Sequence, residues 1–175
     1  MNVIFLDVDG VLNSDRSFIA GFEKTKQYRS NPDNLDDEHF INKVTIFSID
    51  SVAVNLINRV CDICSAKLVI SSTHRKHFRD TEDKLIRMQE YFESFGIQRE
   101  YVIGWTKSLY RIRGIEIKDW LDDHPEVSNY AIVDDDSDML PEQLPFFVHC
   151  DRRVGISADN YIKLLTLFKT DESYD

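Results

Sequence analysis

MNVIFLDVDGVLN, residues 1–13, decides the expected fold, because a short apolar run leads directly into two carboxylates. Val3–Leu6 is wholly apolar, which is typical of a strand buried on both faces of a parallel sheet. Asp7 and Asp9 follow at its end, and Gly10 lets the backbone turn tightly after them. Alternate residues of an extended strand point the same way, so both carboxylates face one side.

Outward from this stretch, strand-like and helix-like segments alternate along the chain. Short apolar runs predict strands, and amphipathic segments with three- and four-residue spacing predict helices. The predicted strands are 3–6, 67–70, 101–103, 130–133 and 146–148, and the predicted helices are 48–64, 81–95, 114–123 and 157–168. Ser48 is the expected N-cap of the first helix. The alternation predicts an α/β fold, with a mostly parallel five-stranded sheet covered by helices on both faces.

Length predicts one domain over residues 1–175, since 20.5 kDa suffices for one substantial core. Residues 14–47 separate the first strand from the first clear helix and are too long for an ordinary connection. We expect an inserted flap or minimal cap over the carboxyl edge of the sheet. A plain surface excursion is the alternative.

Composition narrows the class of protein. The net charge of −10 argues against broad electrostatic binding to a polyanion, although residues 73–79 and 106–114 could form a local basic rim. No apolar run approaches the roughly 20 residues of a membrane span, and the first one breaks at Asp7 without a basic segment before it. A cytoplasmic location is the expectation. Three cysteines, at positions 61, 64 and 150, are too sparse for a disulfide framework and are expected to pack in the core rather than bind zinc.

Polar clusters follow three of the predicted strands: Asp7 with Asp9, Ser71–Arg75, and Asp134–Asp138. Ligands of open α/β sheets bind at the carboxyl ends of the strands, so these clusters should converge. Magnesium prefers oxygen ligands and commonly takes one or two carboxylates, which two of the clusters can supply. An aspartate can also attack phosphorus, and a carboxylic acid two residues on can protonate the leaving oxygen and later activate water.

Phosphoryl transfer also needs donors for the phosphate oxygens. The Ser71 hydroxyl can supply one, and a fixed cation, Arg113 or Lys118, another. His74 and His77 are not expected among the metal ligands, because the site is already rich in oxygen.

The ordered set of motifs resembles the haloacid dehalogenase (HAD) superfamily of phosphohydrolases. Its four motifs correspond to FLDVDGVLN (5–13), LVISS (68–72), RGIEIKDWL (113–121) and AIVDDDSDM (131–139), and they span nearly the whole chain. ISSTHR (70–75) together with the last two motifs is most similar to the HAD phosphatase domain of RNA-repair-type proteins. The resemblance implies a Rossmann-like HAD core.

The resemblance also implies roles at the first motif. Asp7 becomes the nucleophile and a Mg²⁺ ligand, Val8 a ligand through its carbonyl, and Asp9 the general acid and base, also grouped with the metal-binding residues. Ser71 becomes the phosphate-binding hydroxyl.

For the later motifs, the resemblance makes Asp135 a metal ligand, with Asp134 and Asp138 acting behind it or through water. Arg113, which opens its helix, is favoured as the phosphate-binding cation over Lys118. Arginine where lysine is commoner would add a planar two-pronged donor.

The substrate is expected to be a nucleotide or a nucleic-acid terminal phosphate, with the 3′ and 5′ ends left open. Ser72, Thr73, Arg75 and Lys118 are the candidate substrate contacts, and Lys76, Arg79, Lys107 and Arg111 complete the basic rim. Two alternatives remain: a non-catalytic Mg²⁺-binding phosphoacceptor similar to a receiver domain, and a HAD phosphatase for small metabolite phosphates. Asp9 argues against the receiver, which needs no acid or base two residues after its phosphorylated aspartate.

Overall fold

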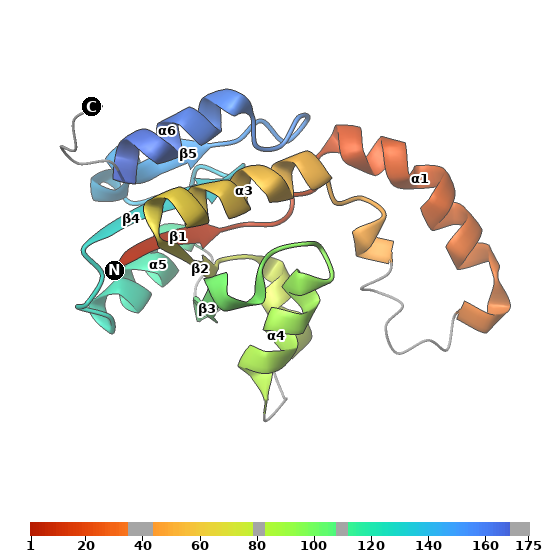
Figure 1. Ribbon diagram of the computed structural model, residues 1–175, viewed down its shortest axis with the longest axis horizontal. Helices are drawn as coiled ribbons and strands as arrows, with labels where there is room; N and C mark the ends of the chain where they lie inside the picture. The colour runs from red at the N-terminus through yellow and green to blue at the C-terminus, as the bar shows by residue number, and fades with distance from the viewer. Residues whose placement is uncertain (35–43, 79–82, 108–111, 169–175) are drawn as a thin grey trace.

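The computed structural model describes residues 1–34, 44–78, 83–107 and 112–168 (Figure 1). Five parallel strands form one sheet in the order β3-β2-β1-β4-β5. Their bounds are β1 Asn2–Leu6, β2 Ala66–Ile70, β3 Val102–Trp105, β4 Asn129–Asp134 and β5 Phe147–His149. The predicted parallel sheet is confirmed, and the strand that carries the two carboxylates at its end lies in the centre.

Helices cover both faces of the sheet. The α-helices are α1 Asp15–Ser30, α3 Ser51–Cys64, α4 Lys84–Glu93, α5 Arg113–Asp122 and α6 Ala158–Phe168. The described residues also form the 3₁₀ helices η1 Pro32–Asn34, η2 Thr73–Phe78, η3 Arg99–Tyr101 and η4 Pro141–Phe146. None of the helices described combines the length and apolar character that a membrane-spanning segment needs.

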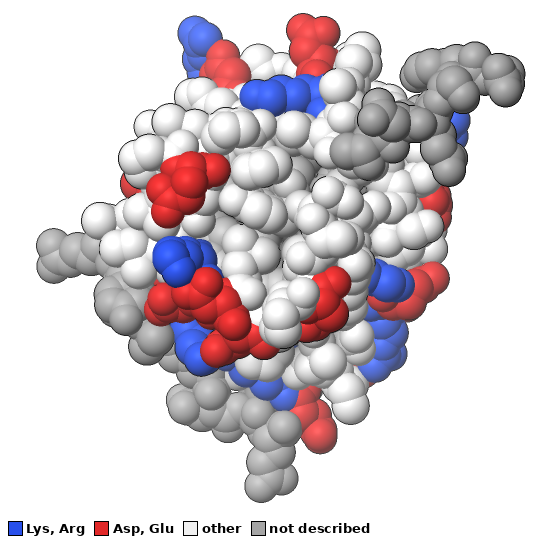
Figure 2. All heavy atoms as spheres, turned by 90° about the vertical axis from the view of Figure 1, so that its left-hand side faces the viewer, with Lys and Arg blue, Asp and Glu red and all other residues white. Residues whose placement is uncertain are grey.

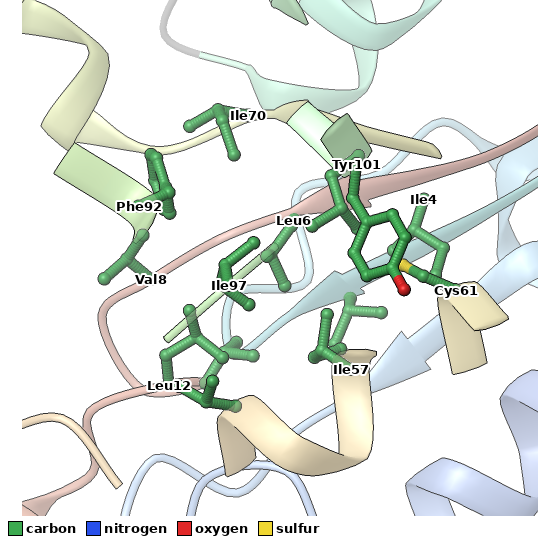
Figure 3. Packing of buried hydrophobic residues seen from close by; sticks show 14 of the residues in the cluster. Ile4, Leu6, Val8, Leu12, Ile57, Cys61, Ile70, Phe92, Ile97 and Tyr101 are labelled. Atoms are coloured by element: carbon green, nitrogen blue, oxygen red, sulfur yellow. The ribbon is translucent and has the colours of Figure 1, made fainter. Parts of the chain in front are cut away.

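Two hydrophobic clusters hold these layers together, because side chains of a strand alternate between the faces. Ile4 and Leu6 of β1 point toward α3, α4 and α6, where they meet Ile57, Cys61 and Phe92 (Figure 3). On the other face, Val3 and Phe5 pack in a smaller cluster beneath α5, with Val69, Ile117, Trp120, Ile132 and Phe147. Cys61 and Cys150 are buried free thiols, as expected of cysteines that fill a core.

Helix α3 differs from the prediction at its start and in its buried face. Asp50 is the N-cap, since its side chain accepts from the Val52 backbone N–H, whereas the Ser48 hydroxyl donates to the Thr45 carbonyl. The three- and four-residue spacing of apolar side chains in this helix predicts a buried face that includes Val52 and Ile63, but both side chains are exposed. The helix is rotated so that Ala53, Val54 and Cys61 are buried together with Ile57 and Val60.

The inserted segment begins with a regular helix. α1 starts directly after the β1 turn, capped by the Ser14 hydroxyl, which accepts from the Ser17 N–H at 3.2 Å. It extends away from the sheet on the side of the carboxyl ends (Figure 1). Residues 35–43 lie outside the described part of the chain. That 14–47 acts as a flap or cap therefore stays a prediction.

Candidate active site

The register of the three central strands brings three motifs to one level. Leu6 of β1 pairs with Ile70 of β2 and with Val133 of β4. The residues that follow these three are Asp7, Ser71 and Asp134. The Asp7 N–H donates to the Val133 carbonyl at 3.0 Å, so the alignment continues one residue beyond β1. Backbone pairing alone thus gathers a carboxylate, a hydroxyl and a second carboxylate at the carboxyl edge.

A cluster of three carboxylates forms the floor of the site. Oxygen atoms of Asp7, Asp134 and Asp135 all lie within 4.8 Å of one another. Burial raises the pKa of Asp7 to about 6 and that of Asp134 to about 8, and the negative charge of Asp7 contributes to the increase at Asp134. Gly10, at φ +77°, lets the turn pass against Asp135, because a Cβ at this position would collide with that carboxylate. The cluster stores repulsion that a bound cation would relieve.

Arg113 supplies the positive charge next to this cluster. Its Nη1 lies 3.5 Å from Asp7 Oδ1 and its Nε lies 3.2 Å from Asp134 Oδ2. Asp138 fixes the start of α5, since its carboxylate accepts from the Arg113 N–H at 2.8 Å. Lys118 lies further along α5, half exposed and paired with Asp122 at 2.5 Å. The structure therefore brings Arg113 to the carboxylates, and the predicted substrate contact by Lys118 does not fit its position.

Two buried atoms of the cluster lack hydrogen bonds. Arg113 Nη1 and Asp134 Oδ2 are both buried, and neither makes a hydrogen bond to any described residue. Buried polar groups in native proteins are otherwise nearly always satisfied. Both atoms take part in the ion pairs of Arg113 with the carboxylates, yet each retains hydrogen-bonding capacity that a phosphate oxygen or a metal ion could use.

Asp9 lies in different surroundings, on the outer side of the site. Its carboxylate is half exposed and accepts from the Asn13 amide at 2.9 Å and the Thr73 hydroxyl at 3.5 Å. The His74 ring nitrogen Nε2 lies 3.3 Å away. These contacts, that of His74 above all, lower the pKa of Asp9 to about 2. Beside Asp9, a cavity of about 430 Å³ is lined by residues that include Asn13, Phe18, Thr45, His74 and Arg152.

Arg75 lies behind the site rather than on its surface. It is buried, its Nη2 donates to Glu116 of α5, and its Nη1 donates to the Thr106 hydroxyl at 2.8 Å. Thr106 in turn donates to the Ser71 hydroxyl at 3.3 Å. The predicted substrate contact by Arg75 is not compatible with this burial. Its guanidinium instead connects the end of β2 to α5 and so holds Ser71 and Arg113 in fixed relation.

A family model described as the HAD domain in Swiss Army Knife RNA repair proteins matches residues 3–161. The chain belongs to this family. The match includes the five strands, apart from the first residue of β1, and every carboxylate of the site, so the predicted RNA-repair-type HAD resemblance is confirmed. Searches of curated proteins and of solved structures returned no match. Membership of the HAD superfamily points to a hydrolase of the phosphatase type.

Val8 and Ser72 of this HAD domain have contacts that differ from their predicted roles. The Val8 carbonyl accepts from the backbone N–H groups of Val11, Leu12 and Asn13 at 2.9–3.2 Å. Its lone pairs are taken by the turn, so a role as metal ligand does not fit. Ser72 is fully buried and its hydroxyl bonds to Asp7, which makes it a support of the carboxylate rather than a substrate contact.

The predicted basic rim is only partly described. Lys107 is exposed and pairs with Asp123 at 3.1 Å, and Lys76 is exposed. Arg79, Arg111 and the His77 side chain lie outside the described part of the HAD domain. Asp9 itself is absent from the three-carboxylate cluster, so its predicted grouping with the metal ligands is not supported by its side chain.

Sequence reasoning missed two residues that contact Asp9. The sequence places Asn13 within the first motif and His74 within the polar cluster after the second strand, without indicating that either contacts Asp9. A signal for Asn13 existed, since an asparagine four residues after Asp9 across a glycine turn can fold back onto it. For His74 no periodicity could reveal the contact, because its ring partners Asp9 and Tyr91 lie 65 and 17 residues away along the chain.

Proposed function

We propose that this HAD domain is a Mg²⁺-dependent phosphatase that acts on phosphate monoesters through an aspartyl-phosphate at Asp7. The observation that carries the proposal is the cluster of Asp7, Asp134 and Asp135, buried at the carboxyl edge with Arg113 within 3.5 Å of two of its members. Phosphoryl transfer depends mainly on positioning and on compensation of negative charge, and this cluster combines a nucleophile with both.

In the first step, an Asp7 carboxylate oxygen attacks phosphorus and the bond to the leaving oxygen breaks. Asp9 gives its proton to that oxygen. In the second step, Asp9 takes a proton from water, the water oxygen attacks phosphorus, and the bond to Asp7 breaks. The contacts of Asp9 favour its ionised form in the free protein, and an arriving phosphate dianion raises the pKa of a neighbouring carboxyl, so substrate entry favours the protonated acid.

The remaining residues hold the phosphate. Arg113 Nη1, buried and without a hydrogen bond to any described residue, is a donor for one phosphate oxygen. The Ser71 hydroxyl, held by Thr106, is a donor for another. Thr73 lies at the rim beside Asp9, where it can meet the leaving group.

Asp7, Asp134 and Asp135 are the residues that would hold Mg²⁺. Oxygen ligands at this separation suit a hard divalent cation, and Asp134 Oδ2, which is buried and makes no hydrogen bond to a described residue, provides a ligand atom. When bound, Mg²⁺ would offset the repulsion among the carboxylates and polarise the phosphate oxygens.

As substrate we propose a nucleotide or a nucleic-acid terminal phosphate. The family description supports an RNA end. The cavity beside Asp9, at about 430 Å³, has the size of small-ligand sites and offers Phe18 for a base and Arg152 for a further phosphate. Figure 2, which faces the amino ends of the strands, shows acidic and basic side chains interspersed there, so contact with a long polyanion is not favoured on that side.

Release of phosphate from p-nitrophenyl phosphate tests the activity. We expect turnover that requires Mg²⁺ and is abolished by Asp7→Asn, whereas Asp159→Asn, which changes an exposed carboxylate on α6, keeps it. An active Asp7→Asn protein would refute the role of Asp7 as the nucleophile. A stable phosphoprotein without turnover would instead favour the phosphoacceptor.

Comparison of substrates tests the second part of the proposal. Mononucleotides, 3′- and 5′-phosphorylated oligonucleotides and sugar phosphates are offered under the same conditions. We expect one of the nucleotide classes to give the highest kcat/KM. A preference for sugar phosphates would favour a metabolite phosphatase.

A further inference from the structure

His74 forms a bridge between Asp9 and a tyrosine of the core. The ring belongs to η2 and is buried, with Nε2 3.3 Å from the Asp9 carboxylate and Nδ1 2.6 Å from the Tyr91 hydroxyl. The Tyr91 hydroxyl also bonds to the side chain of Thr45, in the inserted segment. Four side chains from four parts of the chain thus form one hydrogen-bonded series that ends on Asp9.

Hydrogen-bonding chemistry fixes the direction of this series. An ionised carboxylate only accepts, so the contact with Asp9 requires a proton on His74 Nε2. In a neutral ring Nδ1 then carries no proton and accepts from the Tyr91 hydroxyl. The Tyr91 oxygen remains able to accept from the Thr45 hydroxyl. Every donor therefore points toward Asp9.

Tyr91 gives the series a rigid end. It is buried on α4 among aromatic rings, with ring-centre distances of 4.4 Å to Phe95 and 5.4 Å to both Phe78 and Phe92. Asp9, in contrast, is half exposed, so its carboxylate would rotate freely without fixed partners. An acid or base must lie within hydrogen-bond reach of the proton it transfers, so its orientation limits the rate.

We infer that His74 is the positioning residue of Asp9, with Tyr91 selecting the ring tautomer that makes this possible. This inference rests on the proposed function, in which Asp9 protonates the leaving oxygen. His74 touches neither the phosphate nor Asp7 in this account, and it acts only through Asp9. The link to Thr45 ties the orientation of Asp9 to the inserted segment beside the cavity.

Dependence on the leaving group separates positioning from a general structural role. Phenolate leaves poorly and needs the proton from Asp9, whereas p-nitrophenolate leaves without it. We expect His74→Phe to lower kcat/KM for phenyl phosphate by about tenfold more than for p-nitrophenyl phosphate. His74→Gln, whose amide nitrogen can replace Nε2, should restore most of the difference. Equal losses on both substrates, or no loss, would overturn the inference.

Nitrogen NMR of the labelled protein tests the tautomer without any turnover. We expect His74 protonated at Nε2 and unprotonated at Nδ1, with this preference lost in Tyr91→Phe. Tyr101→Phe is the matched control, since this tyrosine has a buried ring and its hydroxyl bonds to Asp62 away from the site. A proton on Nδ1 in the wild type would overturn the inference while leaving phosphatase function intact. An inactive wild type with the expected tautomer would overturn the proposed function instead.

Discussion

Asp7 and Asp9 leave the same strand two residues apart, yet their surroundings affect them in opposite directions. Asp7 is buried against Asp134, and burial raises its pKa. Asp9 is half exposed among the donors Asn13, Thr73 and His74, which lower its pKa to about 2. The inner carboxylate lies in an acidic cluster with one fixed cation, and the outer one lies in a ring of hydrogen-bond donors.

This difference teaches how one short motif can carry two functions. Environments that push neighbouring pKa values apart are typical of sites where two carboxyl groups have separate roles. The inner side, formed by Asp7, Asp134, Asp135 and Arg113, suits a cation and a phosphate, because bound positive charge relieves the repulsion among its ionised carboxylates. The outer side, formed by Asp9 with Asn13, Thr73 and His74, holds the Asp9 carboxylate in one orientation for proton transfer.

The largest expected effect concerns the support of the inner side, the buried pair of Arg75 and Glu116. Glu116→Leu leaves the Arg75 charge buried without its carboxylate, which typically costs about 3–5 kcal/mol of the free energy of unfolding. Urea denaturation measures it. Asp123→Asn, which breaks the exposed pair with Lys107, should cost less than about 1 kcal/mol. Equal costs for the two variants would show that the buried pair does not support the inner side.

Removal of the Arg113 guanidinium, the fixed cation beside the carboxylates, should have the second-largest effect. Arg113→Ala is expected to lower kcat/KM about 10²–10³-fold, because the phosphate loses a preorganised donor beside Asp7. Steady-state kinetics on an aryl phosphate measures it. Lys118→Ala serves as control on the same helix and should stay within about twofold, since surface changes away from such features are nearly neutral. A larger loss for Lys118→Ala would reverse the assignment of the cation.

Stability as a function of pH should separate the two sides by sign. Because the pKa of Asp134 is raised, the free energy of unfolding should fall as the pH rises above the ordinary aspartate range of about 4. Without divalent metal, Asp134→Asn should therefore become more stable relative to wild type as the pH rises. The lowered pKa of Asp9 contributes stability above a pH of about 4, and this contribution is lost as the pH falls toward 2. Asp9→Asn should therefore be less stable than wild type at neutral pH and approach the stability of wild type in acid. Thermal unfolding in a chelator measures both, and parallel trends would contradict the comparison.

The smallest effect is expected at the start of α5. Asp138→Ala removes the carboxylate that accepts from the Arg113 N–H, and loss of such a cap typically costs about 1 kcal/mol. Because Arg113 opens this helix, kcat/KM should fall as well. Asp136→Ala, in the same loop, is the control. An unchanged melting temperature in Asp138→Ala would mean that α5 is held by other contacts.

Much of this arrangement could be predicted from the sequence, because it follows from strands. The apolar run 3–6 and the acids after it gave the central strand and its carboxylates, and parallel register then brought Ser71 and Asp134 level with Asp7. What could not be predicted depends on partners that lie far apart along the chain. Arg75 was expected at the surface, and only the packing of α5 reveals its pairing with Glu116.

The rotation of α3 has a similar cause. Its periodicity allowed two neighbouring faces, and the small side chains of Ala53 and Cys61 fit the sheet more closely than Val52 and Ile63. The turn after Asp9 likewise determines which carbonyls stay available, and the Val8 carbonyl is consumed by three N–H groups of that turn. Local hydrogen bonds of this kind depend on the conformation of the folded turn, which the residue types of the motif do not specify.

The central claim is that Asp7 becomes phosphorylated, and chemical trapping tests it most directly. Wild-type protein is mixed with Mg²⁺ and p-nitrophenyl phosphate, quenched in acid, reduced with borohydride and analysed by mass spectrometry. Reduction of an acyl phosphate converts the aspartate to homoserine, so the account predicts homoserine at position 7, and none without Mg²⁺ or without substrate. Homoserine at another position, or rapid turnover with Asp7 unmodified, would contradict it.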